Sequence, residues 1–396
     1  MSFEILETET RGTIIKVVGV GGAGGNAVQH MIARNVQGVE FICANTDHQA
    51  LVRSTAKNIL QLGRTGLGAG SRPEAGRAAA EEARDRIADA LRGAHMVFIT
   101  AGMGGGTGTG AAPVVAQIAK DLGILTVAVV SKPFEFEGPK RMKLAEAGVT
   151  ELEDTVHSLI VILNNKLEEV MGEDAEMAEC FRAADDVLHN ACAGIAEIIN
   201  VPGLVNVDFE DVKTVMSEQG KAMMGTALAS GLDRARIAAE QAVASPLLEG
   251  VDLSGARGVL VNITASSSLK MKETREVMNT IRAFAADDAT VIFGTVCDES
   301  VGDGLRVTVV ATGLGRAASK KQSTPFVVVR TGTHDAPMSV PIGSTSAPSA
   351  TSSDYSDFEK PAIWRTRESA QTKVSAMEDS GSDRYDIPAF LRKQAD

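Results

Sequence analysis

Two glycine-rich turns are the part of this sequence with the clearest chemistry. The first covers residues 19–26 (GVGGAGGN) and the second covers residues 104–110 (GGGTGTG), each between an apolar run and a helical pattern. Glycine has no Cβ, so an anion can approach the backbone closely. A helix that begins directly after such a turn directs unpaired N–H groups and the positive end of its dipole at that anion. The turns therefore predict a site for phosphate groups.

The first turn alone leaves two kinds of ligand open. Gly19, Gly21 and Gly24 fit the G-x-G-x-x-G fingerprint of dinucleotide-binding enzymes, and Asp47 follows the next apolar run, where such enzymes hold ribose. The second turn, about eighty residues later, favours a nucleoside triphosphate, because two adjacent turns could share its long anionic tail. The P-loop pattern G-x-x-x-x-G-K-[ST] is absent from the sequence. A dinucleotide-dependent oxidoreductase stays as the alternative.

The second turn, with Ala101-Gly102-Met103 before it and Ala111-Ala112-Pro113 after it, resembles the signature of the tubulin/FtsZ family. The similarity covers roughly residues 13–316 and returns in a short piece at the C-terminus. It implies a GTPase that polymerises with GTP/GDP and Mg²⁺ as ligands. It also implies a role in bacterial cell division, in the cytoplasm at the midcell ring.

The resemblance assigns nucleotide contacts to specific positions. Backbone groups of the turns match the phosphate contacts, namely Gly22, Ala23, Gly24, Gly25, Asn26, Gly106, Thr107 and Gly108, with the Thr107 hydroxyl as an extra donor. Glu137 and Arg141 match ribose and nucleotide contacts; without the resemblance they would be a surface i,i+4 ion pair. Asp185 matches the base contact. A carboxylate there can accept hydrogen bonds from N1–H and N2–H₂ of guanine, a pair that adenine lacks.

An acidic segment gives the predicted catalytic residues. Asp208, Glu210 and Asp211 are typical of a helix N-terminus, where the dipole stabilises negative charge. The resemblance implies more: this loop enters the nucleotide pocket of the next subunit, and Asp208 and Asp211 position or polarise the attacking water. A pocket and a loop on opposite ends of one molecule give a head-to-tail contact that does not close, and therefore a filament.

Two departures from the family pattern bear on hydrolysis. The loop at residues 63–73 is a few residues shorter than usual, with Arg72 where asparagine is common. Leu163-Asn164-Asn165 replaces the common Pro-Asn-Asp at the rim of the expected pocket. A GTP-binding scaffold that does not hydrolyse GTP is therefore a further alternative.

The composition limits the other functions. A net charge of −12 argues against a nucleic-acid binder, and no run approaches the ~18 apolar residues of a membrane span. The four cysteines show no C-x-x-C spacing or pairing with histidine, so we expect no metal site built from side chains and a reducing compartment. The acidic N-terminus has no apolar signal region, which predicts a cytoplasmic protein with no direct membrane insertion.

Short β-branched runs that alternate with helical patterns predict an α/β fold with a parallel sheet. We expect strands over 14–20, 39–45, 96–101, 125–131 and 159–163, a long helix over 175–200 with Phe181, Ala184 and Leu188 on its apolar face, then helices over 211–224 and 233–244 and strands over 258–264, 290–296 and 306–312. The expected organisation is an N-terminal tail (1–12), a GTP-binding domain (13–174), the central helix (175–200), a second α/β domain with a mixed sheet (201–316), a disordered linker (317–383) and a docking peptide (384–396).

The final segment has its own pattern. Ile387, Phe390 and Leu391 recur at helical spacing after a Ser-, Thr- and Pro-rich linker, so residues 384–396 can fold as a short amphipathic helix in a groove. The resemblance implies that this peptide binds membrane-tethering division proteins of the FtsA/ZipA type. It also implies division inhibitors of the MinC type as partners, besides further copies of the chain itself.

Overall fold

The computed structural model describes residues 12–172, 174–201, 203–218, 220–245, 256–286 and 289–314. These ranges hold both glycine turns and the acidic loop. The expected N-terminal tail up to residue 11, the linker and the docking peptide lie outside the described residues, and so do the predictions made for them.

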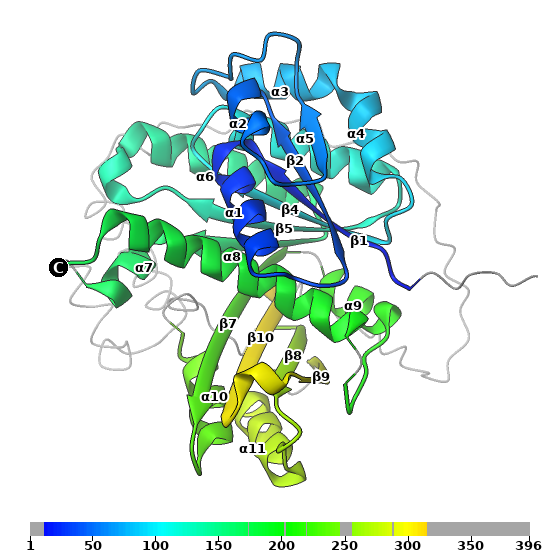
Figure 1. Cartoon of the computed structure of the whole chain (residues 1–396), viewed down its shortest axis with the longest axis vertical. Coiled ribbons are helices and arrows are strands. Elements are labelled where there is room, and N and C mark those ends of the chain that lie inside the picture. Colours follow the sequence, from blue (N-terminus) through cyan, green and yellow to red (C-terminus); the bar gives the residue numbers. More distant parts are fainter. Residues whose placement is uncertain are drawn as a thin grey trace, which may run out of the picture. The chain divides into compact units, whose positions relative to one another are not determined.

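A mixed sheet forms the centre of the described chain (Figure 1). Its order is β3 (Asn58–Gln61), β2 (Val39–Asn45), β1 (Ile15–Val20), β4 (Met96–Gly102), β5 (Leu125–Lys132), β6 (Ser158–Leu163), β7 (Gly220–Ser230), β10 (Gly304–Leu314), β8 (Gly258–Ala265) and β9 (Thr290–Cys297). Every neighbouring pair from β3 to β7 is parallel, while β10 runs antiparallel to both β7 and β8. The carboxyl ends of the first six strands therefore share one edge.

Helices cover both faces of the parallel part, because successive residues of a strand point to opposite faces. Ile15 and Val17 of β1 join a core with α1 (Gly21–Ala33) and α8 (Met177–Asn200), whereas Val18 and Val20 join a core on the other face. That second core includes α3 (Pro73–Glu82), α4 (Arg84–Leu91), α5 (Thr107–Asp121) and α6 (Pro139–Thr155). The remaining helices are α2 (His48–Val52), α7 (Asn164–Met171), α9 (Phe209–Met216), α10 (Arg234–Val243) and α11 (Met271–Arg282).

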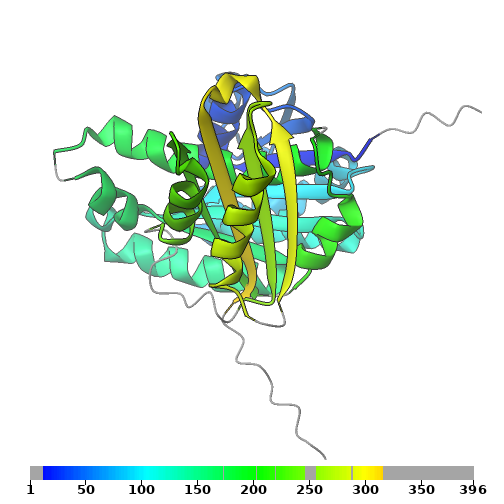
Figure 2. The ribbon, with the colours of Figure 1, turned by 90° about the horizontal axis from the view of Figure 1, so that it is seen from below.

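The two halves of the chain meet at α8 and at the pairing of β6 with β7. That pairing covers Ser158↔Gly220 to Ile160↔Ala222, so the strands of both halves form one sheet. Seen from below, the yellow and yellow-green strands of the second half cross the direction of the cyan strands (Figure 2). The 24 residues of α8 give a length of about 36 Å. Helix α8 therefore lies between the two halves and packs against both of them.

Four expectations need correction. The helix predicted over 211–224 ends at Met216, and Gly220–Ser230 is strand β7, because Gly220 has a φ of +140° and the segment pairs with β10 and β6. Phe181 is not on the buried face of α8; it is 43% exposed. The cysteines are expected from sequence to be small core residues, but Cys297 is exposed; the other three are buried. Strand β3 and helix α11 were not predicted.

Candidate nucleotide site

The glycine turns follow neighbouring parallel strands at the same edge of the sheet. Val20, the last residue of β1, is paired with Ala101 of β4. Helix α1 begins at Gly21 and helix α5 at Thr107, and within the described chain neither has a side-chain cap. The first N–H groups of both helices therefore point to the space beyond this edge without a partner from a cap.

Contacts between the turns require glycine. Gly21 has a φ of +76°, and a Cβ there would lie 3.0 Å from the amide nitrogen of Gly108. A Cβ on Gly108 would collide with the carbonyl oxygen of Gly102, and one on Gly24 would collide with that of Thr100. The two predicted phosphate turns thus touch each other and pack tightly on β4.

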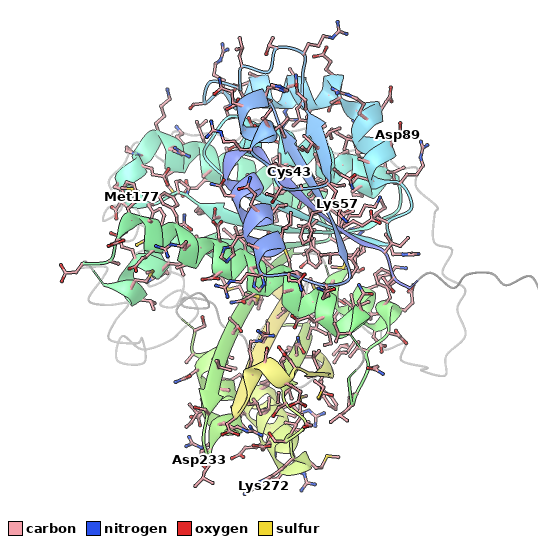
Figure 3. All side chains as sticks on the ribbon, in the orientation of Figure 1. Cys43, Lys57, Asp89, Met177, Asp233 and Lys272 are labelled. Carbon is pink, nitrogen blue, oxygen red and sulfur yellow. The ribbon has the colours of Figure 1, made fainter. Side chains whose placement is uncertain are left out.

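Other glycines of the turns are open on their outer side. A Cβ on Gly22, Gly25 or Gly105 would meet no described atom within 4 Å. Beside Gly22 and Gly25 lies a hollow of about 240 Å³, whose lining also includes Asn26 and Asn45. Cys43, labelled in Figure 3, lines it from β2. Bare backbone next to a hollow is suited to an anionic ligand.

Two hydroxyl groups cross-link the second turn to the end of β2. The Oγ1 atoms of Thr46 and Thr107 lie 2.6 Å apart, and Thr46 is buried. If Thr46 donates in this bond, the Thr107 hydroxyl keeps its proton for a ligand, as the sequence predicts. Thr109 stabilises the turn differently, because its Oγ1 accepts a hydrogen bond of 2.8 Å from the Gly104 amide.

Glu137 and Arg141 lie next to the second turn and are more than a surface ion pair. Their side chains are 3.0 Å apart, with Glu137 only 14% exposed. Oε1 of Glu137 accepts a hydrogen bond of 2.9 Å from the Phe134 amide. Gly104, with a φ of +94°, approaches so closely that a Cβ would lie 2.7 Å from the Arg141 carbonyl oxygen. The structure thus brings both predicted residues to the phosphate turns.

Aromatic contacts connect the segment after β5 with helix α8. The rings of Phe134 and Phe181 meet edge to face at 5.2 Å, and both line a hollow of about 120 Å³. Asp185 follows Phe181 by one helical turn and is partly buried. Burial raises the pKa of Asp185 to about 6; the charge of His30 acts in the opposite direction, and that of Asp186 raises the pKa further. Asp185 is thus a carboxylate that water solvates poorly and that a ligand with N–H donors would stabilise.

Asp208 and Asp211 lie away from these residues. Asp208 caps α9, since its Oδ1 accepts a hydrogen bond of 2.8 Å from the Asp211 amide, and both side chains are exposed. The ring of Phe209, between them, packs on His95 at 6.1 Å, directly before β4 begins. The acidic loop therefore lies at the amino edge of the sheet, about 20 Å from the glycine turns across the six residues of β1.

The residues that depart from the family pattern, Arg72, Asn164 and Asn165, lie close to the turns or at the end of β6. Arg72 is exposed, but its backbone packs on the second turn, where a Cβ on Gly106 would lie 2.9 Å from the Arg72 amide nitrogen. Asn164 is buried at the end of β6, and its Oδ1 has no hydrogen-bond partner among the described residues. Asn165 accepts a hydrogen bond of 2.8 Å from the Glu135 amide. Asn45, Thr46 and Asn164 were not predicted as site residues; their place at strand carboxyl ends was the signal that could have found them.

The described residues hold no group of three or more His, Cys, Asp or Glu side chains able to bind a metal. Neutral oxygen donors beside the turns include the hydroxyls of Thr46 and Thr107 and the side-chain amide of Asn45, which suit a Mg²⁺ ion held mainly by phosphate oxygens and water. None of the helices in the described ranges has the length and hydropathy to cross a bilayer.

Comparison with known proteins gives matches over both halves. Residues 14–172 match the tubulin/FtsZ family GTPase domain, and residues 220–315 match the FtsZ family C-terminal domain. The cell division protein FtsZ of Coxiella burnetii is 53% identical, with 99% of each chain covered. That of Pseudomonas aeruginosa is 52% identical, with 100% of each chain covered. A solved FtsZ dimer from M. jannaschii aligns with a TM-score of 0.73 at 42% identity, covering 78% of this chain and 89% of that one.

Proposed function

Because the chain belongs to the tubulin/FtsZ family, we propose that it is a GTP-hydrolysing protein of bacterial cell division that assembles head to tail. One observation carries the proposal most: the glycine turns and the acidic loop lie at opposite edges of the same sheet. One chain then has half of a hydrolytic site at each end. A second chain is needed to complete either half.

In this proposal the nucleotide extends from the glycine turns to α8. The open backbone of Gly22 and Gly25 at the hollow, together with the backbone of residues 106–108 in the second turn, holds the phosphates. Arg141 and Glu137 contact the nucleotide between phosphate and base, and Asp185 accepts from N1–H and N2–H₂ of guanine. Mg²⁺ bound through the phosphates, with the hydroxyls of Thr46 and Thr107 nearby, would neutralise part of their charge.

Hydrolysis takes place where one chain meets the next. Asp208 and Asp211 of the arriving subunit position the attacking water, and phosphoryl transfer depends mostly on such placement and on charge stabilisation. Exposed apolar side chains support both contact faces: Leu67 and Phe136 are exposed on segments that follow the carboxyl ends of β3 and β5, and Leu204 and Val205 are exposed shortly before Asp208 in the chain. A contact between unlike faces repeats without closing and gives a filament.

The cellular role extends this proposal to residues outside the described ranges. Filaments would form the division ring at midcell, and residues 384–396 would attach them to membrane-tethering proteins of the FtsA/ZipA type. Inhibitors of the MinC type would act on the same filaments. We expect GTP, GDP and Mg²⁺ as ligands and no nucleic acid.

The test is GTP turnover as a function of protein concentration, with ATP as the control nucleotide. We expect activity per chain to rise above a threshold concentration at which light scattering detects polymer, and ATP to be turned over much more slowly. Guanine binding with no turnover at any concentration would favour the scaffold alternative and point to Arg72. Tight binding of a nicotinamide dinucleotide instead of GTP would favour an oxidoreductase.

A further inference from the structure

A cluster of ionisable side chains joins α1 to α8 beside Asp185. The Nε2 atom of His30 lies 2.8 Å from Oδ1 of Asp186, and Nη2 of Arg34 lies 2.7 Å from the same oxygen. The ring of His30 also meets the ring of His189 edge to face, with 6.1 Å between centroids. We refer to His30, Arg34 and Asp186 as the α1–α8 clamp.

The clamp connects the two ends of the proposed nucleotide site. Helix α1 begins at the first phosphate turn and carries His30 further along, while α8 carries Asp186 directly after the base-contacting Asp185. The His30 side chain is 19% exposed and that of Asp186 is 40% exposed, so solvent screens the contact only in part. Because His30 and Arg34 both donate to Oδ1 of Asp186, they hold the side of α8 that carries Asp186 against α1 and oppose rotation of α8 about its axis.

We infer that the α1–α8 clamp positions the Asp185 carboxylate for guanine recognition. The inference rests on the proposed function, because it assigns a task to residues around the proposed base contact. Asp185 and Asp186 are neighbours on one helix, so any rotation that the clamp prevents would move the Asp185 carboxylate. A carboxylate that accepts two N–H groups at once loses this paired contact when it shifts, or when it gains a proton and presents an O–H in place of one acceptor oxygen.

The charges around Asp185 come from both helices. His30 on α1 lowers the pKa of Asp185 against the larger effect of burial, and Asp186 on α8 raises it. Burial lowers the pKa of His189; the charges of Arg34 and His30 lower it as well, and Asp186 raises it. On α7, which also packs against α8, Lys166 pairs with Glu169 at 2.8 Å. Two of the clamp residues, His30 and Asp186, thus shift the pKa of Asp185 in opposite directions.

The test compares GDP with inosine diphosphate (IDP) in the full-length protein between pH 5 and pH 8. Inosine lacks the 2-amino group of guanine, so the ratio of the two affinities measures how well the Asp185 carboxylate reads the base. In the wild-type protein we expect this ratio to be largest above pH 6 and to fall as Asp185 gains a proton. In His30→Ala and in Asp186→Asn we expect GDP affinity to drop about tenfold and the ratio to move towards one.

The pH midpoint of the ratio separates positioning from a purely structural role. His30→Ala removes a group that lowers the pKa of Asp185, so the midpoint should move to higher pH. Asp186→Asn removes a charge that raises this pKa and replaces the charged clamp contact by a weaker neutral one, so the midpoint should move to lower pH while GDP affinity falls. Arg84→Ala is the control, because Arg84 bonds Asp121 at 2.8 Å between α4 and the end of α5. It should change neither ratio nor midpoint.

Two results would contradict the proposed role of the clamp. One is an unchanged ratio and midpoint in both clamp variants; the other is an equal loss of GDP and IDP affinity with no midpoint shift, which indicates a structural contact. A wild-type protein that binds ADP as tightly as GDP would instead contradict the guanine assignment. Failure of the clamp and failure of the proposed function are thus distinguishable.

Discussion

Phe209 packs edge to face on His95, with 6.1 Å between ring centroids, and this contact fixes the acidic loop at the amino edge of the sheet. His95 is itself held there, because its Nδ1 accepts a hydrogen bond of 2.9 Å from the Ile14 amide at the start of β1. On the other side of the loop, the Val205 amide donates to Oγ1 of Thr295 at 2.8 Å. The loop is therefore anchored to both halves of the chain and cannot fold back to the glycine turns.

Adjacent glycines of the first turn should respond in opposite ways to alanine. Gly24→Ala places a Cβ against the Thr100 carbonyl oxygen, and we expect it to lower the free energy of unfolding by about 1–3 kcal/mol. Gly25→Ala meets no described atom, so helix propensity should raise stability by about 0.5–1 kcal/mol while the added methyl weakens GDP binding. Thermal unfolding and calorimetric titration of both variants check this. Equal destabilisation by the two changes would contradict the packing described for Gly24.

Asp185→Asn should stabilise the nucleotide-free protein at neutral pH while it weakens guanine binding. Burial raises the pKa of Asp185 from its ordinary value of 3.8 to about 6 in the folded chain, so this group favours folding below about pH 4 and loses that contribution as the pH rises through 6. The variant should therefore exceed the wild type in unfolding free energy at pH 7.5 and not at pH 4. Chemical denaturation at both pH values measures this. A variant less stable than the wild type at pH 7.5 would contradict the burial of the Asp185 charge.

The buried ion pair of the second half predicts a large loss of stability. Nε of Arg234 lies 2.7 Å from Oε1 of Glu273, and both side chains are mostly buried. Arg234→Ala leaves the Glu273 carboxylate buried without its partner, at a cost of about 3–5 kcal/mol. Arg236→Ala is the matched control, because Arg236 pairs with Glu240 on the surface and such pairs contribute about 0–1 kcal/mol. Equal effects in urea unfolding would contradict this difference.

The same pair gives a pH dependence with a defined sign. The hydrogen bond from Arg234 is the largest cause that lowers the pKa of Glu273 below 4.5. Its contribution is therefore present at neutral pH and is lost as the pH falls through the folded-state pKa. The stability difference between wild type and Arg234→Ala should shrink on acidification below pH 4.5. A difference that stays constant down to pH 3 would contradict the assignment.

Deletion of residues 384–396 should leave GTP turnover and filament formation unchanged and abolish recruitment to a membrane tether. The reason is the distance along the chain, since about seventy residues separate this peptide from Leu314, where the last described strand ends. Phe390→Ala should reproduce most of the loss, because one aromatic anchor often dominates the affinity of a short peptide. Sedimentation with tether-coated vesicles measures recruitment. Loss of GTP turnover in the deletion would contradict a separate docking role.

The sequence predicts those parts of the fold that local patterns determine. β-Branched runs before glycine turns located β1 and β4 almost to the residue, and the i, i+4 pattern located α8. Residues 220–224 were wrongly predicted as helix because their Lys, Ala and Met content favours helices, whereas pairing with β10 and the backbone of Gly220 decide their structure. Tertiary contacts override propensity there.

The candidate site also combines residues that local sequence patterns predict with residues that they do not. The phosphate turns follow from glycine spacing, whereas Asp185, Glu137 and Arg141 came only from the family resemblance. The contact between His30 and Asp186 joins residues 156 positions apart, and no local pattern reveals it. The buried Oδ1 atom of Asn164, which has no hydrogen-bond partner among the described residues, also could not be predicted, because its burial depends on tertiary packing at the end of β6.

The most direct test of the central claim mixes two variants that are each impaired in a different half of the site. Asp211→Asn keeps its nucleotide pocket but lacks the loop carboxylate, and Asp185→Asn keeps the loop but binds GTP poorly. If the site is formed between chains, an equimolar mixture should hydrolyse GTP well above the mean of the separate variants, since about a quarter of random contacts join an intact pocket to an intact loop. A mixture that shows only the mean of the two separate activities would contradict a site shared between subunits.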